Sequence, residues 1–214
     1  MVENATLETK NNALYGLLDA VDKCRIQANS HLDEDTRGQK GQFMTPASAA
    51  RILATKFRHL NGELSIIDAG AGVGSLTTAL VERALNDFSP TAINANVWEL
   101  ENVLVKNLND SLKLCEQAAV ESEVTWHSNV NCVDFISHAV TLIKQRNLGQ
   151  KVFLSNKAIL NPPYLKISAS SVERKLLRSV GVETGNLYSC FVALALMLLD
   201  SGGGACCDNS TQFL

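Results

Sequence analysis

The sequence predicts an α/β fold built around a mainly parallel sheet. Two observations lead to this prediction. Apolar, β-branched runs alternate along the chain with segments of helical periodicity, and a glycine-rich turn directly follows the first of those runs. The chain has 214 residues, which suits one domain with a small appendage. Its content of 46 % apolar and 19 % charged residues is typical of a globular protein.

The part of the chain before the glycine-rich turn predicts two helices joined by a loop. Residues 1–37 form a polar, largely helical lead-in, because the apolar side chains of 12–28 recur at helical spacing. A glycine-bearing loop follows. At its end, Thr45 is a candidate N-cap and Pro46 a candidate first helical residue for a helix over 47–57.

Strand and helix signals alternate after this point. Residues 64–85 predict a β-branched strand, a glycine loop and a helix. Further strands are expected at 92–101, 123–130 and 152–160, and further helices at 103–119, 132–146, 170–180 and 186–199. Strands that alternate with helices pair in parallel, in a sheet that helices cover on both faces.

The turn "DAGAGVGS" combines an acid with three glycines. Glycines at 70, 72 and 74, just before a helix, let the backbone approach a ligand at a helix N-terminus. The dinucleotide fingerprint needs a glycine where Ser75 stands, and Asp68 would repel a diphosphate while holding a cationic, amino-acid-like group. Glu99, after the second strand, is placed to accept hydrogen bonds from ribose hydroxyls. A nucleoside that carries an amino acid is indicated, and S-adenosylmethionine fits this description.

The stretch "AILNPPYLKIS" predicts a stiff corner at the end of the fourth strand. Prolines cannot donate to a β-ladder, so the strand stops there, at the edge where open α/β sheets bind ligands. The Asn161 side-chain carbonyl and the Pro162 backbone carbonyl could accept hydrogen bonds from an exocyclic amino group, and Tyr164 offers a face for stacking on a base. A base inside a duplex would have to flip out to reach this corner.

Bulk properties exclude several classes of protein. No apolar run reaches the length of a membrane span, and the polar N-terminus does not resemble a signal peptide, so we expect a cytoplasmic protein. The six cysteines contain no CxxC pair and are expected to be reduced thiols, so no metal is predicted. The net charge of −3 excludes binding to nucleic acid by charge alone.

Six motifs occur along the chain in the order that is seen in a known enzyme family: "KGQFMTP", "DAGAGVGSLT", "WELE", "VDFI", "AILNPPYLKIS" and "NLYSCFVALALMLLDSGG". In this combination the chain resembles the N6-adenine DNA methyltransferases of restriction–modification systems, especially the PstI-like and Eco57I-like enzymes. The resemblance covers roughly residues 38–204. It implies a Rossmann-like methyltransferase fold, S-adenosylmethionine as cofactor, double-stranded DNA as substrate and a cognate restriction endonuclease as a possible partner.

The resemblance also implies roles for individual residues. Those expected to bind the cofactor are Phe43, Thr45, Pro46, Asp68, Gly70, Gly72, Glu99, Asp134 and Phe135. Those expected to hold the target adenine and support catalysis are Asn161, Pro162, Pro163 and Tyr164. In the segment after the corner, Arg174, Lys175 and Arg178 could meet DNA phosphates. The alternative for that segment is an ordinary solvated helix face.

The pattern breaks at the end of the chain. The family continues with a strand, a motif of the type "LVAITPRSF", two more strands and a large target-recognition domain, whereas this chain ends "GGGACCDNSTQFL". Some of the codon choices that encode this tail also encode the family motif when they are read one nucleotide out of frame. We therefore interpret 205–214 as an aberrant, frameshifted tail that is neither strand nor helix, and 38–204 as an incomplete catalytic domain. We expect little or no methylation activity from this chain alone.

Two other functions stay open. Asn-Pro-Pro-Tyr also serves enzymes that methylate protein glutamine, but those generally lack a "GQFMTP" loop ahead of the cofactor strand. The third possibility is a non-catalytic, cofactor-binding remnant. A nicotinamide-dependent dehydrogenase is disfavoured by Asp68 and Ser75 and has no use for the proline corner.

Overall fold

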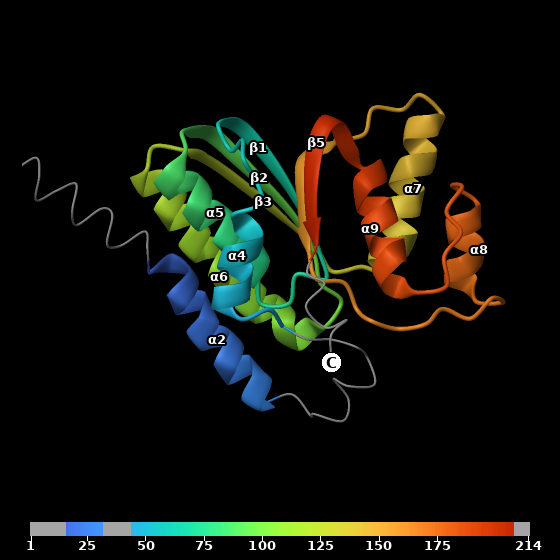
Figure 1. The fold of residues 1–214 in the computed structure, drawn as a ribbon, viewed down its shortest axis with the longest axis horizontal. Coiled ribbons are helices and arrows are strands. Elements are labelled where there is room, and N and C mark those ends of the chain that lie inside the picture. Colours follow the sequence, from blue (N-terminus) through green and yellow to red (C-terminus); the bar gives the residue numbers. More distant parts are fainter. Residues whose placement is uncertain (1–15, 32–43, 208–214) are drawn as a thin grey trace, which may run out of the picture.

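The computed structural model describes residues 16–31 and 44–207, and within them a five-stranded sheet has the order β3-β2-β1-β4-β5 (Figure 1). All neighbouring strands pair in parallel, as predicted. The strands are β1 (Gly62–Ala69), β2 (Pro90–Trp98), β3 (Thr125–Asn131), β4 (Ser155–Leu160) and β5 (Leu199–Cys207). The helices are α2 (Leu17–His31), α4 (Ala47–Ala54), α5 (Ser75–Asp87), α6 (Asn102–Glu121), α7 (Phe135–Asn147), α8 (Val172–Arg178) and α9 (Leu187–Met197).

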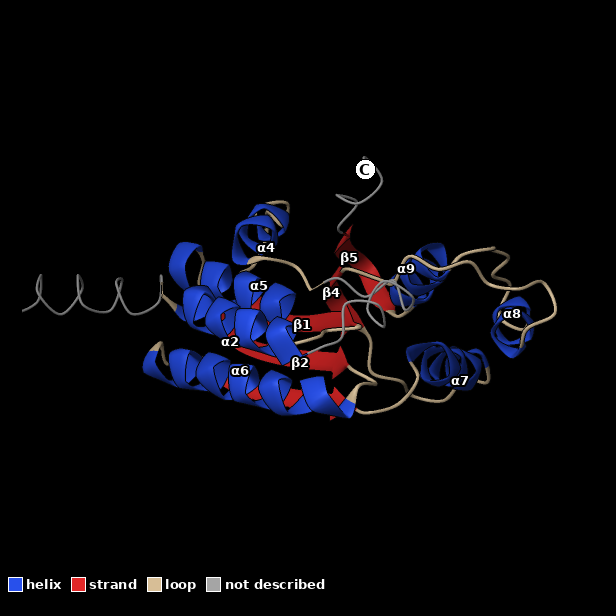
Figure 2. Ribbon diagram, turned by 90° about the horizontal axis from the view of Figure 1, so that it is seen from below, coloured by secondary structure: helices blue, strands red, loops and turns tan. Residues whose placement is uncertain are grey.

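Helices lie on both sides of the sheet, with α2, α4, α5 and α6 on one side and α7, α8 and α9 on the other (Figure 2). Successive residues of a strand point to opposite faces, so Ile66 packs in the first helical layer and Ile67 in the second. The cover on the second side is incomplete. The polar side chains of His127 and Asn129 on β3 lie toward the outer edge of the sheet and are exposed to water.

The strand order places a topological switch point between β1 and β4. The chain moves outward from β1 to β2 and β3, then returns to β4 on the other side of β1. Because all strands are parallel, the loops after β1, β2, β3 and β4 emerge at one edge of the sheet. Three acids and the proline corner follow those strands or end them: Asp68, Glu99, Asp134 and Asn161 with its prolines. The fold therefore brings the three acids and the proline corner to the same edge of the sheet.

The helix α4 begins differently from the prediction. Thr45 was expected to cap it, but the helix has Pro46 at its N-cap position, and the Asp22 carboxylate of α2 accepts the Ala47 N–H at 3.0 Å. The Thr45 hydroxyl instead accepts a hydrogen bond from the Asn161 side-chain amide at 3.1 Å. Because α2 packs beside α4, Asp22 accepts the hydrogen bond that Thr45 was expected to accept. The Thr45 hydroxyl can therefore accept the Asn161 amide of the proline corner.

The prediction that 205–214 contains no strand is wrong for Ala205 to Cys207. These residues complete β5 and pair in parallel with Ala158 to Leu160 of β4. A strand ladder uses backbone N–H and C=O groups, which any residue except proline supplies, and the two cysteines also present small apolar side chains to the neighbouring layers. Residues 208–214 lie outside the described part of the chain, and the frameshift stays a hypothesis about the gene.

The most apolar stretch of the sequence forms α9, a buried helix. Its residues Cys190, Phe191, Leu194 and Ala195 are buried in the layer that α9 shares with α7 and α8. Across 16–31 and 44–207, none of the helices combines the length and apolar character that crossing a bilayer requires.

Candidate active site

A cavity of about 580 Å³ lies at the edge of the sheet where the strands β1 to β4 end. Of the residues predicted for the site, the wall contains Thr45, Gly70, Gly72, Glu99, Asp134, Phe135, Asn161 and Pro163. They come from five separate segments of the chain, so only the fold brings them together. A volume of this size suits a nucleotide-sized ligand with room for part of a second molecule.

The sequence predicts eight further site residues. Phe43 falls outside the described residues. The wall of the cavity does not include Pro46, Asp68, Pro162, Tyr164, Arg174, Lys175 or Arg178. Pro46 is exposed at the start of α4, whereas Asp68 is completely buried beneath the glycine loop. Their roles stay predictions.

The glycine loop has the conformation that its sequence predicts. Gly70, Gly72 and Gly74 all have positive φ, and a Cβ at Gly74 would lie 3.0 Å from the Leu108 side chain. The backbone carbonyl of Trp98 accepts the Gly70 and Ala71 N–H groups, each at 2.9 Å. These bonds fasten the loop to the end of β2, so that it forms one wall of the cavity.

The Glu99 carboxylate also holds the glycine loop in place through hydrogen bonds. One carboxylate oxygen accepts the Gly72 N–H and the other accepts the Glu101 N–H, each at 2.8 Å. Burial raises the pKa of the Glu99 carboxyl, while the bonds from backbone N–H groups oppose that rise. Each carboxylate oxygen has a second lone pair, so Glu99 can still accept a hydrogen bond from a ligand.

Asp68 connects the end of β1 to the first turn of α5. Its Oδ2 accepts the backbone N–H of Thr77 at 3.2 Å and the Thr77 hydroxyl at 2.7 Å. Its Oδ1 is buried and has no hydrogen-bond partner within the described residues. Burial raises the pKa of the Asp68 carboxyl to about 7, against the opposing effect of the Thr77 bonds. The carboxyl therefore titrates near neutral pH in the folded chain.

This raised pKa predicts a pH dependence of stability. Between the ordinary value of 3.8 and about 7, the folded state keeps a proton that the unfolded state has released. The free energy of unfolding should therefore fall as pH rises through this window. Asp68→Asn cannot ionise, so we expect a flatter curve and a relative gain in stability at pH above 7. Urea unfolding at several pH values measures both curves, and parallel curves would contradict the prediction.

A row of aromatic side chains forms another wall, and only part of it was predicted. The Trp98 and Phe135 rings meet edge to face at 5.2 Å between centroids, and Phe135 packs on Phe191 at 5.0 Å. The Trp98 indole N–H donates to Nδ1 of His138 at 3.0 Å, which holds the indole in place. Trp98, His138 and Phe191 were not among the predicted site residues, although a tryptophan directly before Glu99 was an available signal.

The proline corner contributes Asn161 and Pro163 to the cavity wall. Because the Asn161 amide nitrogen donates to Thr45, the hydrogen-bond network assigns the carbonyl oxygen to the other side of that amide group. Tyr164 stacks on Tyr188 of α9, with ring centroids 5.3 Å apart and planes 26° apart. One face of the Tyr164 ring is therefore covered by protein.

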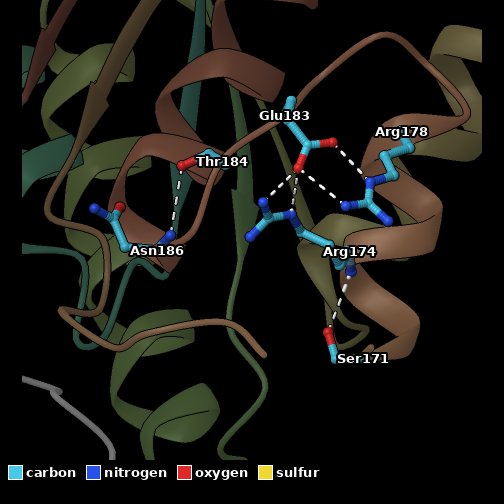
Figure 3. Close-up of polar contacts among 6 residues, drawn as sticks. All are labelled: Ser171, Arg174, Arg178, Glu183, Thr184 and Asn186. Carbon is cyan, nitrogen blue, oxygen red and sulfur yellow. Dashed lines mark hydrogen bonds and ion pairs between the residues drawn. The ribbon is translucent and has the colours of Figure 1, made fainter. Parts of the chain in front are cut away.

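The three cations predicted to meet DNA lie on α8 and do not themselves line the cavity. Arg174 and Arg178 both bind the carboxylate of Glu183 in the turn that follows the helix (Figure 3). Lys175 is exposed. The N-terminal end of the same helix does reach the cavity, through Ser171 and Glu173. No pattern in the sequence pairs Glu183 with the two arginines.

The residues of the cavity fit the cofactor that the sequence suggested. Ser75 lines the cavity, and its buried hydroxyl has no partner within the described part of the chain, so a polar ligand atom could bind it. Glu99 retains acceptor capacity near the glycine loop, and Trp98 and Phe135 offer apolar faces for a purine. Within 16–31 and 44–207, no group of three or more metal-binding side chains occurs.

The fold is that of the S-adenosylmethionine-dependent methyltransferases. A solved Listeria monocytogenes protein assigned to class I of these enzymes matches 92 % of this chain and 52 % of its own, with a TM-score of 0.52 at 14 % identity. In sequence, the chain is similar to type II methyltransferases. No family model matches the chain.

Two curated relatives show this similarity. The chain is 46 % identical to the type II methyltransferase M.PstI of Providencia stuartii over 183 residues, 86 % of this chain and 35 % of that protein. It is 37 % identical to the type II methyltransferase M.BsuBI of Bacillus subtilis over 191 residues, 87 % of this chain and 36 % of that protein. The chain therefore spans about a third of the length of the curated relatives it matches.

Proposed function

We propose that this chain is the cofactor- and adenine-binding core of an N6-adenine DNA methyltransferase. The reaction transfers a methyl group from S-adenosylmethionine to the amino nitrogen of an adenine flipped out of duplex DNA. A restriction–modification system, with a cognate endonuclease, is the proposed setting. The relatives named type II methyltransferases support this proposal, and a cytoplasmic location goes with it.

One observation carries the proposal. Asn161 of the corner and Gly70 to Gly72 of the cofactor loop line the same cavity, so a bound cofactor and a target base could meet there. The loop that contains Met44 and Thr45 also lines the cavity and contacts Asn161 directly. This contact favours the DNA enzymes, in which such a loop precedes the cofactor strand, over the enzymes that methylate protein glutamine.

The residues then have separate tasks. When bound, S-adenosylmethionine supplies an electrophilic methyl group, and breaking its sulfur–methyl bond leaves S-adenosylhomocysteine. The carbonyl oxygens of Asn161 and Pro162 would accept hydrogen bonds from the adenine amino group and favour a tetrahedral nitrogen whose lone pair can form the new N–C bond. One proton of that nitrogen then leaves to solvent. Thr45 would keep the Asn161 amide in the required orientation.

A single-turnover experiment tests the function. The chain, in excess, is incubated with S-adenosylmethionine and a short single-stranded oligonucleotide, which removes the need for base flipping. We expect slow formation of N6-methyladenine, detected by mass spectrometry of the digested nucleosides, and little or no methylation of plasmid DNA. Methyl groups found only on a glutamine-containing peptide, or on no substrate, would contradict the proposal.

A further inference from the structure

A cluster of charges joins α8 to the turn that follows it. Glu183 Oε1 lies 2.8 Å from Nε of Arg174 and 3.2 Å from a terminal nitrogen of Arg178, and Oε2 lies 2.7 Å from Nε of Arg178 (Figure 3). One carboxylate thus bridges two guanidinium groups. Lys175 lies between the two arginines in sequence and is exposed, so cations outnumber the carboxylate.

Two of the three members of the cluster are open to water. The side chains of Arg178 and Glu183 are 51 % and 54 % exposed, whereas that of Arg174 is 16 % exposed. Hydrogen bonds from Arg178 and then from Arg174 lower the pKa of Glu183 to about 2, so its carboxylate is an anion throughout the physiological range. Exposed ion pairs contribute little to stability because water and salt screen them. Another anion could therefore replace Glu183 without unfolding the helix.

The cluster also adjoins the cavity. The residues that follow Glu183 pair with the segment just after the proline corner, because Ile167 donates to the Gly185 carbonyl and Leu187 to the Leu165 carbonyl, each at 2.8 Å. Leu165, Ile167 and Leu187 all line the cavity. Arg174 itself reaches over this turn, with a terminal nitrogen 3.6 Å from the position of a Cβ on Gly185.

We propose that Arg174 and Arg178 form a phosphate site that Glu183 occupies in the free chain, and that a backbone phosphate of the DNA replaces the carboxylate. The inference rests on the proposed function, since the DNA that delivers an adenine to the cavity must run past its rim. Guanidinium groups bind phosphate and carboxylate oxygens with the same forked geometry. Glu183 then lowers the affinity for DNA until a phosphate displaces it.

Glu183→Gln tests this exchange by removing the charge of the competing group. Fluorescence anisotropy with a labelled duplex of 20 base pairs, over a series of KCl concentrations, gives the affinity and its salt dependence. We expect several-fold tighter binding at low salt and a salt slope steeper by about 1 to 2, as for one or two additional phosphate contacts. Replacing both arginines by glutamine in the Glu183→Gln background should abolish the gain.

A matched control separates this effect from a simple change in net charge. Asp110→Asn, on α6, also removes one exposed carboxylate and releases its partner Lys113, 3.1 Å away. We expect it to change DNA binding much less than Glu183→Gln does. Equal gains for the two variants, or unchanged or weaker binding by Glu183→Gln, would overturn the phosphate site.

A second measurement distinguishes failure of the phosphate site from failure of the proposed methyltransferase function. If the cluster only supports the cavity wall, Glu183→Gln will lower both the melting temperature and the affinity for S-adenosylhomocysteine without tightening DNA binding, and this outcome also overturns the inference. Absence of N6-methyladenine in the single-turnover test would contradict the proposed function. A gain in DNA affinity that depends on the arginines would still support the phosphate site in that case.

Discussion

Asn161→Ala should abolish methyl transfer to adenine while the chain still binds S-adenosylhomocysteine. Asn161 is half-buried on the wall of the cavity and is not part of the glycine loop, so its loss removes an acceptor from the target base and leaves the cofactor loop intact. Removal of one preorganised hydrogen-bonding group from an active site lowers the rate on the order of 10²-fold or more. Single-turnover formation of N6-methyladenine measures the rate, and calorimetric titration measures the binding.

Two substitutions at Thr45 serve as the control for this prediction. Thr45→Ser keeps the hydroxyl that accepts the Asn161 amide, whereas Thr45→Val removes it with little change in volume. We expect Thr45→Ser to retain the rate and Thr45→Val to lose up to about tenfold, the equivalent of one hydrogen bond. If Asn161→Ala transfers methyl groups as fast as the unchanged chain, the corner has no role in catalysis.

Glu99→Ala should weaken both the fold near the cavity and the affinity for S-adenosylhomocysteine. The substitution leaves the buried Gly72 N–H without its acceptor, which costs about 1–3 kcal/mol of the free energy of unfolding. We expect the melting temperature to fall by about 2–4 °C per kcal/mol and the affinity to fall by about tenfold or more. Thermal unfolding and calorimetric titration give the two values.

Glu99→Gln and Glu116→Ala bracket this effect. Glutamine keeps one carbonyl oxygen as an acceptor but turns an amide NH2 toward the second backbone N–H, so an intermediate loss is expected. Glu116 is exposed on α6, far along the chain from the glycine loop, and its replacement should change stability by at most about 0.5 kcal/mol. Glu99→Ala with the affinity and stability of Glu116→Ala would show that the loop does not need Glu99.

The local parts of this protein are predictable from its sequence because they depend on neighbours along the chain. The positive φ of Gly70, Gly72 and Gly74 follows from the demands of a strand–loop–helix turn, and the strand before Asn161 ends because proline has no N–H to donate. The alternation of strand and helix likewise predicts the parallel sheet, and thereby the edge where the site lies.

Contacts between distant segments depend on how the elements pack, which no local pattern contains. Thr45 and Asn161 are 116 residues apart in sequence, and Thr45 is free to meet the corner because Asp22 takes the expected place as acceptor for α4. The His138 bond to Trp98 and the Glu183 bonds to the α8 arginines arise in the same way. Strand β5 also depends on tertiary context, because Ala205 to Cys207 have weak strand signals and become a strand through the open backbone edge of β4.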